Sequence, residues 1–122
     1  MSEPLFVGFD TSNYTTSAAV CDADGEVLLN ARTLLPVREG ERGLRQSDAV
    51  FFHVRNLPDL LGQVRETVRG RVVRAVGCSV SPRRAEGSYM PCFLSGIMAA
   101  EAFAAAIDVP VLRFAHQEGH IM

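Results

Sequence analysis

The hydrophobic pattern of this 122-residue chain changes its period along the sequence, and that change restricts the folds it can adopt. Residues 5–9, 16–21 and 26–31 are short apolar runs bounded by turn-forming residues, which is typical of strands. The second and third runs are separated by residues 22–25, whose sequence Asp-Ala-Asp-Gly favours a tight turn. We therefore expect the chain to begin with three antiparallel strands.

An amphipathic helix is predicted after a polar connection at residues 36–46. Over residues 48–68 the apolar positions recur every three or four residues, with Ser47 or Asp48 as the expected N-cap. Pro58 is expected to kink or split this helix, because proline removes a backbone donor and crowds the preceding turn. The predicted inward stripe consists of Val50, Val54, Leu57, Leu61, Val64 and Val68.

The second half of the chain alternates strand and helix patterns. Residues 74–80 are almost wholly apolar and predict a central parallel strand. A buried helix follows from about Pro91 to residue 107, with Gly96 allowing it to lie close to the sheet, and residues 111–114 form a last strand. The order β-β-β-α-β-α-β implies a mixed sheet with helices packed on it. This is the ribonuclease-H-like α/β order of one lobe of the actin, hexokinase and Hsp70 (ASKHA) architecture.

Composition is that of an ordinary globular domain. Hydrophobic residues make up 48% of the chain and charged residues 21%, and the net charge of -2 gives no electrostatic footprint for nucleic acid. The three cysteines lack C-x-x-C spacing, so we expect reduced, mostly buried thiols in a cytoplasmic protein. The apolar segment 90–107 is short for a bilayer and contains Glu101, so no membrane span is expected.

The end of the chain carries a potential metal site. His116 and His120 are four residues apart, so in a helix they would lie one turn apart on the same face. Two neutral imidazoles in that arrangement can hold one divalent cation and leave other coordination positions open. Taken alone, the same spacing also fits a polar strand-to-helix turn.

Four segments together resemble the amino-terminal lobe of the TsaD or Gcp family, long called O-sialoglycoprotein endopeptidases or glycoproteases. The family's first phosphate loop resembles Gly8-Phe9-Asp10-Thr11-Ser12 with Thr16, and its H-V-R-x-L helix segment resembles His53-Val54-Arg55-Asn56-Leu57-Pro58. Ser81-Pro82 with Gly96 stands at the place of the family's glycine-proline-glycine loop. The family's H-x-E-G-H metal motif resembles His116-Gln117-Glu118-Gly119-His120. The resemblance implies a tRNA threonylcarbamoyladenosine-synthesis protein. Residues 1–122 would then be a single amino-terminal lobe of a two-lobed protein, with the second lobe absent from this sequence.

The resemblance also implies which residues bind ligands. Asp10, Thr11 and Ser12 would line the phosphate side of ATP or threonylcarbamoyl-adenylate, and His116 and His120 would hold one iron or zinc ion. The metal would polarise the carbonyl that the adenosine amine of tRNA attacks. In the family the remaining protein ligand is an aspartate of the second lobe, so we expect the isolated lobe to be inactive and tRNA to bind only in the full complex.

Two departures from the family pattern indicate a divergent paralogue. The family's acidic pair is replaced by Asn13-Tyr14-Thr15-Thr16, and its glycine loop by a segment that contains Arg83 and Arg84. The arginines would bind an anion through their side chains, or they belong to an ordinary solvated loop. The alternative hypothesis is therefore a non-catalytic scaffold like TsaB, a relative of the family.

The resemblance implies a partner, either a TsaB-like protein or a second copy of this chain, bound through the 48–68 helix. Phe51 and Phe52 are adjacent and cannot both face inward, so one is available to another surface. His53 is expected at the helix surface or the edge of the core. A metallopeptidase, the historical family label, is a third interpretation, but H-E-x-x-H is missing and Glu118 lies between the histidines.

Overall fold

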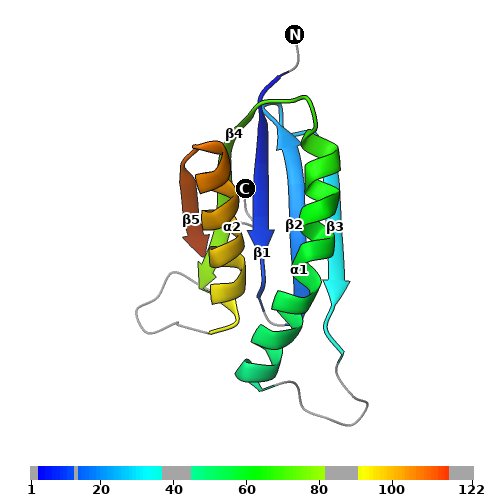
Figure 1. Ribbon diagram of the computed structural model, residues 1–122, viewed down its shortest axis with the longest axis vertical. Helices are drawn as coiled ribbons and strands as arrows, with labels where there is room; N and C mark the ends of the chain where they lie inside the picture. Colours follow the sequence, from blue (N-terminus) through cyan, green and yellow to red (C-terminus); the bar gives the residue numbers. More distant parts are fainter. Residues whose placement is uncertain (1–2, 13, 37–44, 82–90, 116–122) are drawn as a thin grey trace.

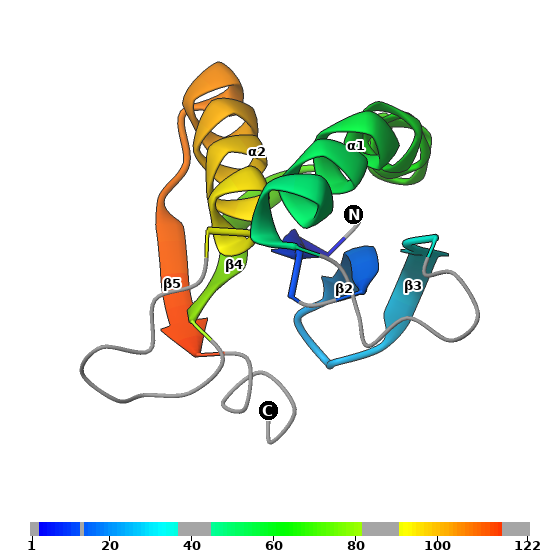
Figure 2. The same ribbon diagram turned by 90° about the horizontal axis from the view of Figure 1, so that it is seen from below.

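The computed structural model describes residues 3–12, 14–36, 45–81 and 91–115, which fold into one mixed sheet with two helices on the same face (Figure 1; Figure 2). The elements in chain order are β1 (Leu5–Asp10), β2 (Thr15–Asp22), β3 (Val27–Leu34), α1 (Gln46–Val68), β4 (Val73–Ser81), α2 (Phe93–Ile107) and β5 (Val111–Ala115). This is the predicted order, so the predicted α/β fold class is confirmed.

β1 lies at the centre of the sheet, whose strand order is β3-β2-β1-β4-β5. The first three strands are antiparallel neighbours, whereas β4 runs parallel to β1 and β5 parallel to β4. Parallel neighbours need a crossover connection, and α1 and α2 supply the two crossovers. Val7 pairs with Val20 on β2 and with Val76 on β4, and all three are buried. β1 ends at Asp10, at the same end of the molecule as the first turns of both helices (Figure 1).

The core lies between the helix-covered face of this sheet and the two helices. Along β1, Leu5, Val7 and Phe9 are buried and alternate with half-buried residues, as expected of a strand with one covered face. α1 contributes large aliphatic side chains, whereas α2 contributes mainly alanines, which let it lie close to the sheet. The rings of Phe9 and Phe103 meet edge to face with their centroids 6.2 Å apart. The helix residues buried in this core are Leu57, Leu60, Val64, Ala99, Ala100 and Ala104.

α1 begins at Gln46, and the prediction that Ser47 or Asp48 caps it is wrong. Arg45 occupies the N-cap position and makes no side-chain cap hydrogen bond. The Gln46 side chain accepts a hydrogen bond from the backbone N–H of Cys92 at 3.1 Å, so a contact with the residue before α2 fixes this end of the helix. This contact satisfies a backbone donor at the start of α2, whereas α1 itself has no side-chain cap.

Pro58 does not split α1, which runs through it as one 23-residue helix. The proline is exposed, so water can reach the Val54 carbonyl that lacks its usual donor. Val54 was placed in the inward stripe by its spacing but is 49% exposed. The observed buried side is rotated from the predicted one because alanine and histidine carry little weight in a hydrophobic pattern. That side consists of Ala49, His53, Leu57, Leu60 and Val64.

The three cysteines are free thiols. Cys78 and Cys92 are buried and Cys21 is half-buried, as their apolar surroundings in the sequence predict. Among the residues that the structure describes, no helix is both long enough and apolar enough to cross a membrane.

Candidate functional site

The predicted phosphate-loop residues lie where β1 ends, beside the end of β4. The Asp10 carboxylate accepts a hydrogen bond from the backbone N–H of Ser12 at 2.8 Å and another from the Ser79 hydroxyl at 3.0 Å. Asp10 therefore shapes the turn and links β1 to β4. Ligands of α/β folds commonly bind at this carboxyl edge of parallel strands. The structure brings Asp10, Thr11 and Ser12 together there, and phosphate binding by them stays a prediction.

Thr11 is fully buried and holds the first turn of α2. Its hydroxyl donates a hydrogen bond to the Cys92 carbonyl at 2.8 Å and accepts one from the Gly96 backbone N–H at 3.0 Å. The hydroxyl thus satisfies a backbone donor of the first helical turn, the role that an N-cap side chain usually fills. We call this pair of hydrogen bonds the Thr11 clamp.

Gly96 makes the Thr11 clamp sterically possible. A Cβ atom at this position would lie 2.9 Å from Thr11 Oγ1 and 3.3 Å from Thr11 Cγ2, which is closer than ordinary contact. The predicted close packing of the second helix against the sheet is therefore confirmed at this residue.

Thr16, on β2, holds α1 in a corresponding way. Its Oγ1 lies 2.8 Å from His53 Nδ1 and accepts a hydrogen bond from Asn56 Nδ2 at 3.1 Å. The hydroxyl can donate to His53 Nδ1 or accept from it, depending on the imidazole tautomer, while the same oxygen accepts from Asn56. Thr16 and His53 are both fully buried, so His53 is a core residue and not the surface or edge residue that we expected. We call these contacts the Thr16 clamp.

The N-terminal halves of α1 and α2 are joined directly as well. Gln46 binds the Cys92 backbone, and the half-buried Phe52 packs against a second small core beside it. The beginnings of the two helices lie side by side (Figure 2). The buried members of this second core are Leu35, Ala49, Cys92 and Phe93.

Large apolar side chains are exposed on these same helical turns. On α1, Phe51 is 60% and Val54 49% exposed, and on α2, Leu94 is 46% and Met98 59% exposed. The rings of Phe51 and Phe52 meet edge to face with their centroids 5.3 Å apart. Phe51 is exposed and Phe52 half-buried, which confirms that only one of these two aromatics faces inward. We call Phe51, Val54, Leu94 and Met98 the apolar helix surface.

The thiols of Cys78 and Cys21 are not activated nucleophiles. Burial raises the pKa of the Cys78 thiol, while the nearby charge of Arg113 lowers it and that of Glu101 raises it. Burial also raises the pKa of Cys21, and Asp22 adds to that effect. A raised thiol pKa keeps the sulfur protonated at neutral pH, where it is a weak nucleophile.

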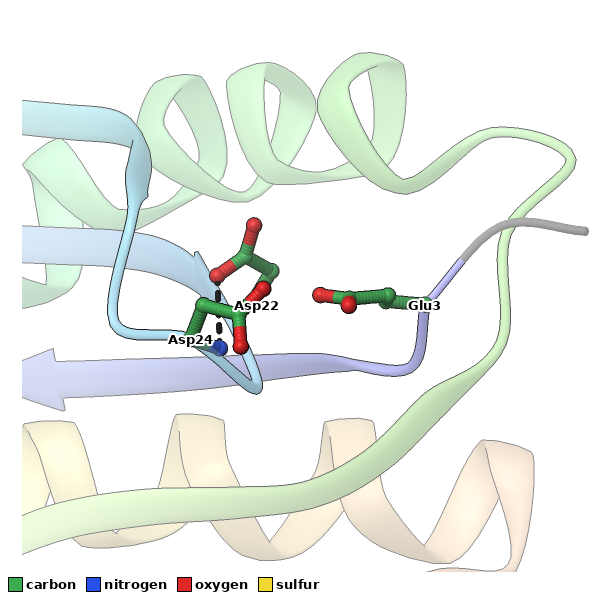
Figure 3. Close-up of side chains that lie close together, drawn as sticks. All are labelled: Glu3, Asp22 and Asp24. Carbon is green, nitrogen blue, oxygen red and sulfur yellow. Dashed lines mark hydrogen bonds between the residues drawn. The ribbon is translucent and has the colours of Figure 1, made fainter.

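A separate acidic cluster lies where β1 begins, at the other end of the sheet (Figure 3). Glu3, Asp22 and Asp24 have carboxylate oxygens within 4.8 Å of one another, and repulsion from Asp24 raises the pKa of Glu3. Asp22 also accepts hydrogen bonds from the backbone N–H groups of Asp24 and Glu26, each at 2.9 Å, and so shapes the β2–β3 turn. Its carboxylate has a structural role in a solvated turn.

The predicted metal ligands His116 and His120, and the paired Arg83 and Arg84, lie outside the described residues, so these predictions stay predictions. The contacts of His53 and Asn56 were not anticipated from the sequence. The available signal was their spacing on α1, which puts both polar residues near the buried side of an otherwise amphipathic helix.

The arrangement of the sheet and its two crossovers is ribonuclease-H-like. Solved structures share it, and three of them are compared with this chain. YeaZ from Pseudomonas aeruginosa has a TM-score of 0.61 at 19% identity, covering 92% of this chain and 44% of that one. An uncharacterized protein with similarity to the peptidase YeaZ from Pseudomonas aeruginosa has a TM-score of 0.60 at 18% identity, and the match covers 92% of this chain and 43% of that one. Thermus thermophilus RuvC in complex with a Holliday junction substrate has a TM-score of 0.53 at 13% identity, and the match covers 94% of this chain and 66% of that one.

At these identities the similarity establishes the fold alone. The chain spans less than half the length of the two YeaZ structures. No protein-family model and no curated protein matches the sequence.

Proposed function

We propose that this chain is a non-catalytic, TsaB-like partner protein of the tRNA threonylcarbamoyladenosine system and that it binds its partner through the apolar helix surface. YeaZ is the TsaB protein of that system, and its structural similarity supports this alternative better than a catalytic TsaD lobe. The partner would be a TsaD-family protein or a second copy of this chain, with tRNA bound only in the full complex. Three free cysteines accord with a cytoplasmic protein.

The observation that carries this proposal is the exposure of the apolar helix surface. Phe51 and Met98 each leave more than half of their surface in water, on the first turns of two adjacent helices. Exposed large apolar side chains on neighbouring elements are typical of interaction sites when they adjoin one another, and the beginnings of α1 and α2 lie side by side. Aromatic residues and methionine are also enriched at the centres of protein interfaces.

The polar groups at the carboxyl end of β1 support a scaffold more than a catalyst. Both hydrogen-bonding roles of the Thr11 hydroxyl are used within the chain, and Asp10 is committed to Ser12 and Ser79. The family's acidic pair is also missing at residues 13–16. A scaffold needs a stable surface, and these contacts supply one.

Binding experiments with the full-length chain test the proposal. Phe51→Asp places a carboxylate on the apolar helix surface, and we expect it to weaken binding to the TsaD-family protein of the same genome by at least about tenfold, since interfaces exclude unpaired charge from their centres. Val72→Asp is the matched control, because Val72 is equally apolar and 67% exposed but lies in the turn after α1. Calorimetry with the TsaD-family protein and sedimentation equilibrium of the chain alone measure the two kinds of partner. Equal binding by both variants and the wild type contradicts the proposal.

A catalytic, metal- and nucleotide-binding lobe is the second candidate function, favoured by the placement of Asp10, Thr11 and Ser12 at the carboxyl edge of the sheet. His116 and His120 offer imidazole ligands that suit iron or zinc, and ATP or threonylcarbamoyl-adenylate would occupy the phosphate side. Elemental analysis of the purified chain tests it. Near-stoichiometric metal that is lost in His116→Ala and His120→Ala supports this function, and metal-free protein counts against it.

A further inference from the structure

We propose that Thr11 and Thr16 are positioning residues for partner binding: their buried hydroxyls set how the first turns of α1 and α2 are rotated and spaced, and so fix the shape of the apolar helix surface. This inference rests on the proposed function, because it explains how the same surface is kept in a binding-competent arrangement. It assigns the two threonines a role that neither the phosphate-loop resemblance nor the hydrophobic pattern gives them.

The two threonines are placed to act together. The antiparallel register of β1 and β2 pairs Asp10 with Ser17, so Thr11 and Thr16 are the next residues of the same hairpin. Both are fully buried on the side of the sheet that the helices cover, and each holds a different helix. One short turn therefore connects the anchors of both helices.

Each clamp lies directly under the exposed residues of its helix. His53 and Asn56 of the Thr16 clamp alternate along α1 with Phe51 and Val54. On α2, Gly96 of the Thr11 clamp lies midway between Leu94 and Met98. Because the buried and exposed residues share the same turns, a helix cannot rotate at its clamp without moving its exposed side chains.

Apolar packing alone would not hold this geometry. α2 meets the sheet mainly through alanines, and the hydrophobic effect has no preferred direction. Hydrogen bonds weaken steeply when they are bent, and a fully satisfied buried network favours one arrangement. A helix has a radius of roughly 5 Å with its side chains, so a rotation of about 20° would move an exposed side chain by roughly 2 Å. A displacement of that size disturbs the shape complementarity that interfaces need.

The link between the helices makes the surface one unit. The Cys92 carbonyl accepts a hydrogen bond from the Thr11 hydroxyl, and the Cys92 N–H donates one to the Gln46 side chain at the start of α1. Loosening either clamp is therefore expected to change the relative placement of the two helices, in addition to the position of one of them.

Hydroxyl-deletion variants of the full-length chain test this inference. Thr16→Val and Thr11→Val keep the branched shape and remove only the hydroxyl. We expect each to weaken binding of the TsaD-family protein by about tenfold under conditions where the variant is fully folded, which corresponds to ~1.4 kcal/mol. Thr16→Ser and Thr11→Ser keep the hydroxyl and should restore binding to within about twofold of the wild type. Hydrogen exchange should be faster over residues 46–56 in Thr16→Val and over residues 92–98 in Thr11→Val.

Thr67→Val is the matched control, because it removes a hydroxyl that donates to the Gln63 carbonyl at the far end of α1 (2.8 Å). Its binding should equal that of the wild type. If Thr16→Val does not fold, Asn56→Ala removes a single donor of the same clamp and should weaken binding by about threefold, because one of two hydrogen bonds remains.

Two results overturn the inference, and a third, distinguishable result overturns the proposed function. The positioning role is overturned if Thr16→Val and Thr11→Val, or Asn56→Ala, fold and bind the partner with wild-type affinity. The proposed function then still stands if Phe51→Asp weakens binding. Weak binding that the serine variants do not restore also overturns it, because shape and not the hydroxyl would then be responsible. Unchanged binding in Phe51→Asp overturns the proposed function itself.

Discussion

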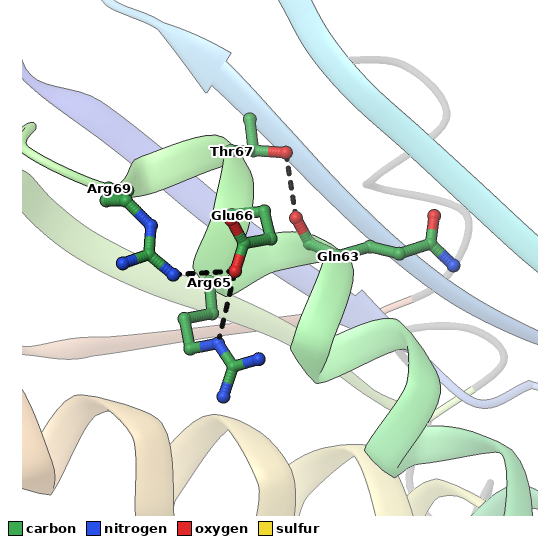
Figure 4. Close-up of polar contacts among 5 residues, drawn as sticks. All are labelled: Gln63, Arg65, Glu66, Thr67 and Arg69. Carbon is green, nitrogen blue, oxygen red and sulfur yellow. Dashed lines mark hydrogen bonds and ion pairs between the residues drawn. The ribbon is translucent and has the colours of Figure 1, made fainter.

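The two ends of α1 are built differently. At its beginning, His53 and Asn56 are hydrogen-bonded to Thr16 beneath exposed apolar side chains. At its end, Glu66 forms exposed ion pairs with Arg69 at 2.6 Å and with Arg65 at 3.6 Å (Figure 4). The first end has buried polar contacts beneath exposed apolar side chains, beside an exposed ion pair of Arg45 with Asp48, whereas the polar contacts of the second end are all exposed.

The buried hydrogen bonds at the first end hold the helix in place, whereas the exposed charges at the second end keep its surface hydrated. Removing the hydrogen-bond partner of a buried group destabilises the folded state by about 1–3 kcal/mol, because no water replaces the partner. An exposed ion pair is screened by water and ions and contributes little. The first turns of α1 are therefore held in a defined position by polar contacts, whereas the exposed charges of its last turns can vary with little effect on the fold.

The largest difference between the two ends is expected on removing a side chain from each. His53→Ala leaves a cavity and removes one of the two hydrogen bonds of the Thr16 hydroxyl, and it should lower the free energy of unfolding by roughly 3 kcal/mol. Gln63→Ala, at the exposed end, should change it by less than about 0.5 kcal/mol. Urea unfolding followed by circular dichroism measures both. Similar values for the two variants would remove the distinction.

Two glycine substitutions are expected to have effects of opposite sign. Gly96→Ala puts a methyl group against Thr11 and should destabilise the fold by about 1–3 kcal/mol. Gly62→Ala, in the second half of α1, meets nothing within 4 Å and should stabilise the protein by up to about 1 kcal/mol, since alanine is the better helix former. Thermal unfolding of the two variants gives the signs. A stable Gly96→Ala variant would show that α2 does not depend on this close approach.

The smallest effect concerns the charge at the exposed end. The hydrogen bond from Arg69 lowers the pKa of the Glu66 carboxyl below its usual 4.5, with the charges of Arg69 and Arg65 adding to it. The folded-state pKa is lowered, so any stabilisation is present above the usual pKa and is lost as the pH falls through the folded-state value. An NMR titration should show a lowered Glu66 pKa that returns toward 4.5 in Arg69→Gln or in high salt. A Glu66 pKa that neither change moves would count against the ion pair.

The order of elements and most of the core were predictable because period and turn composition are local properties of a sequence. The clamps were not, since they join residues such as Thr16 and His53 that are 37 positions apart. The start of α1 was misplaced for the same reason, because the partner of Gln46 lies on another element. Polar residues on the buried side of a helix give no periodic signal, although they decide how that helix is placed here.

Observation of the Met98 methyl group by NMR tests the central claim most directly. Met98 is the one methionine among the described residues and belongs to the apolar helix surface, so its methyl group is a probe of that surface. When the TsaD-family protein is added to the full-length chain, we expect the Met98 signal to shift or broaden to saturation at a fixed stoichiometry. A complex that forms while the Met98 signal stays unchanged would contradict partner binding through this surface.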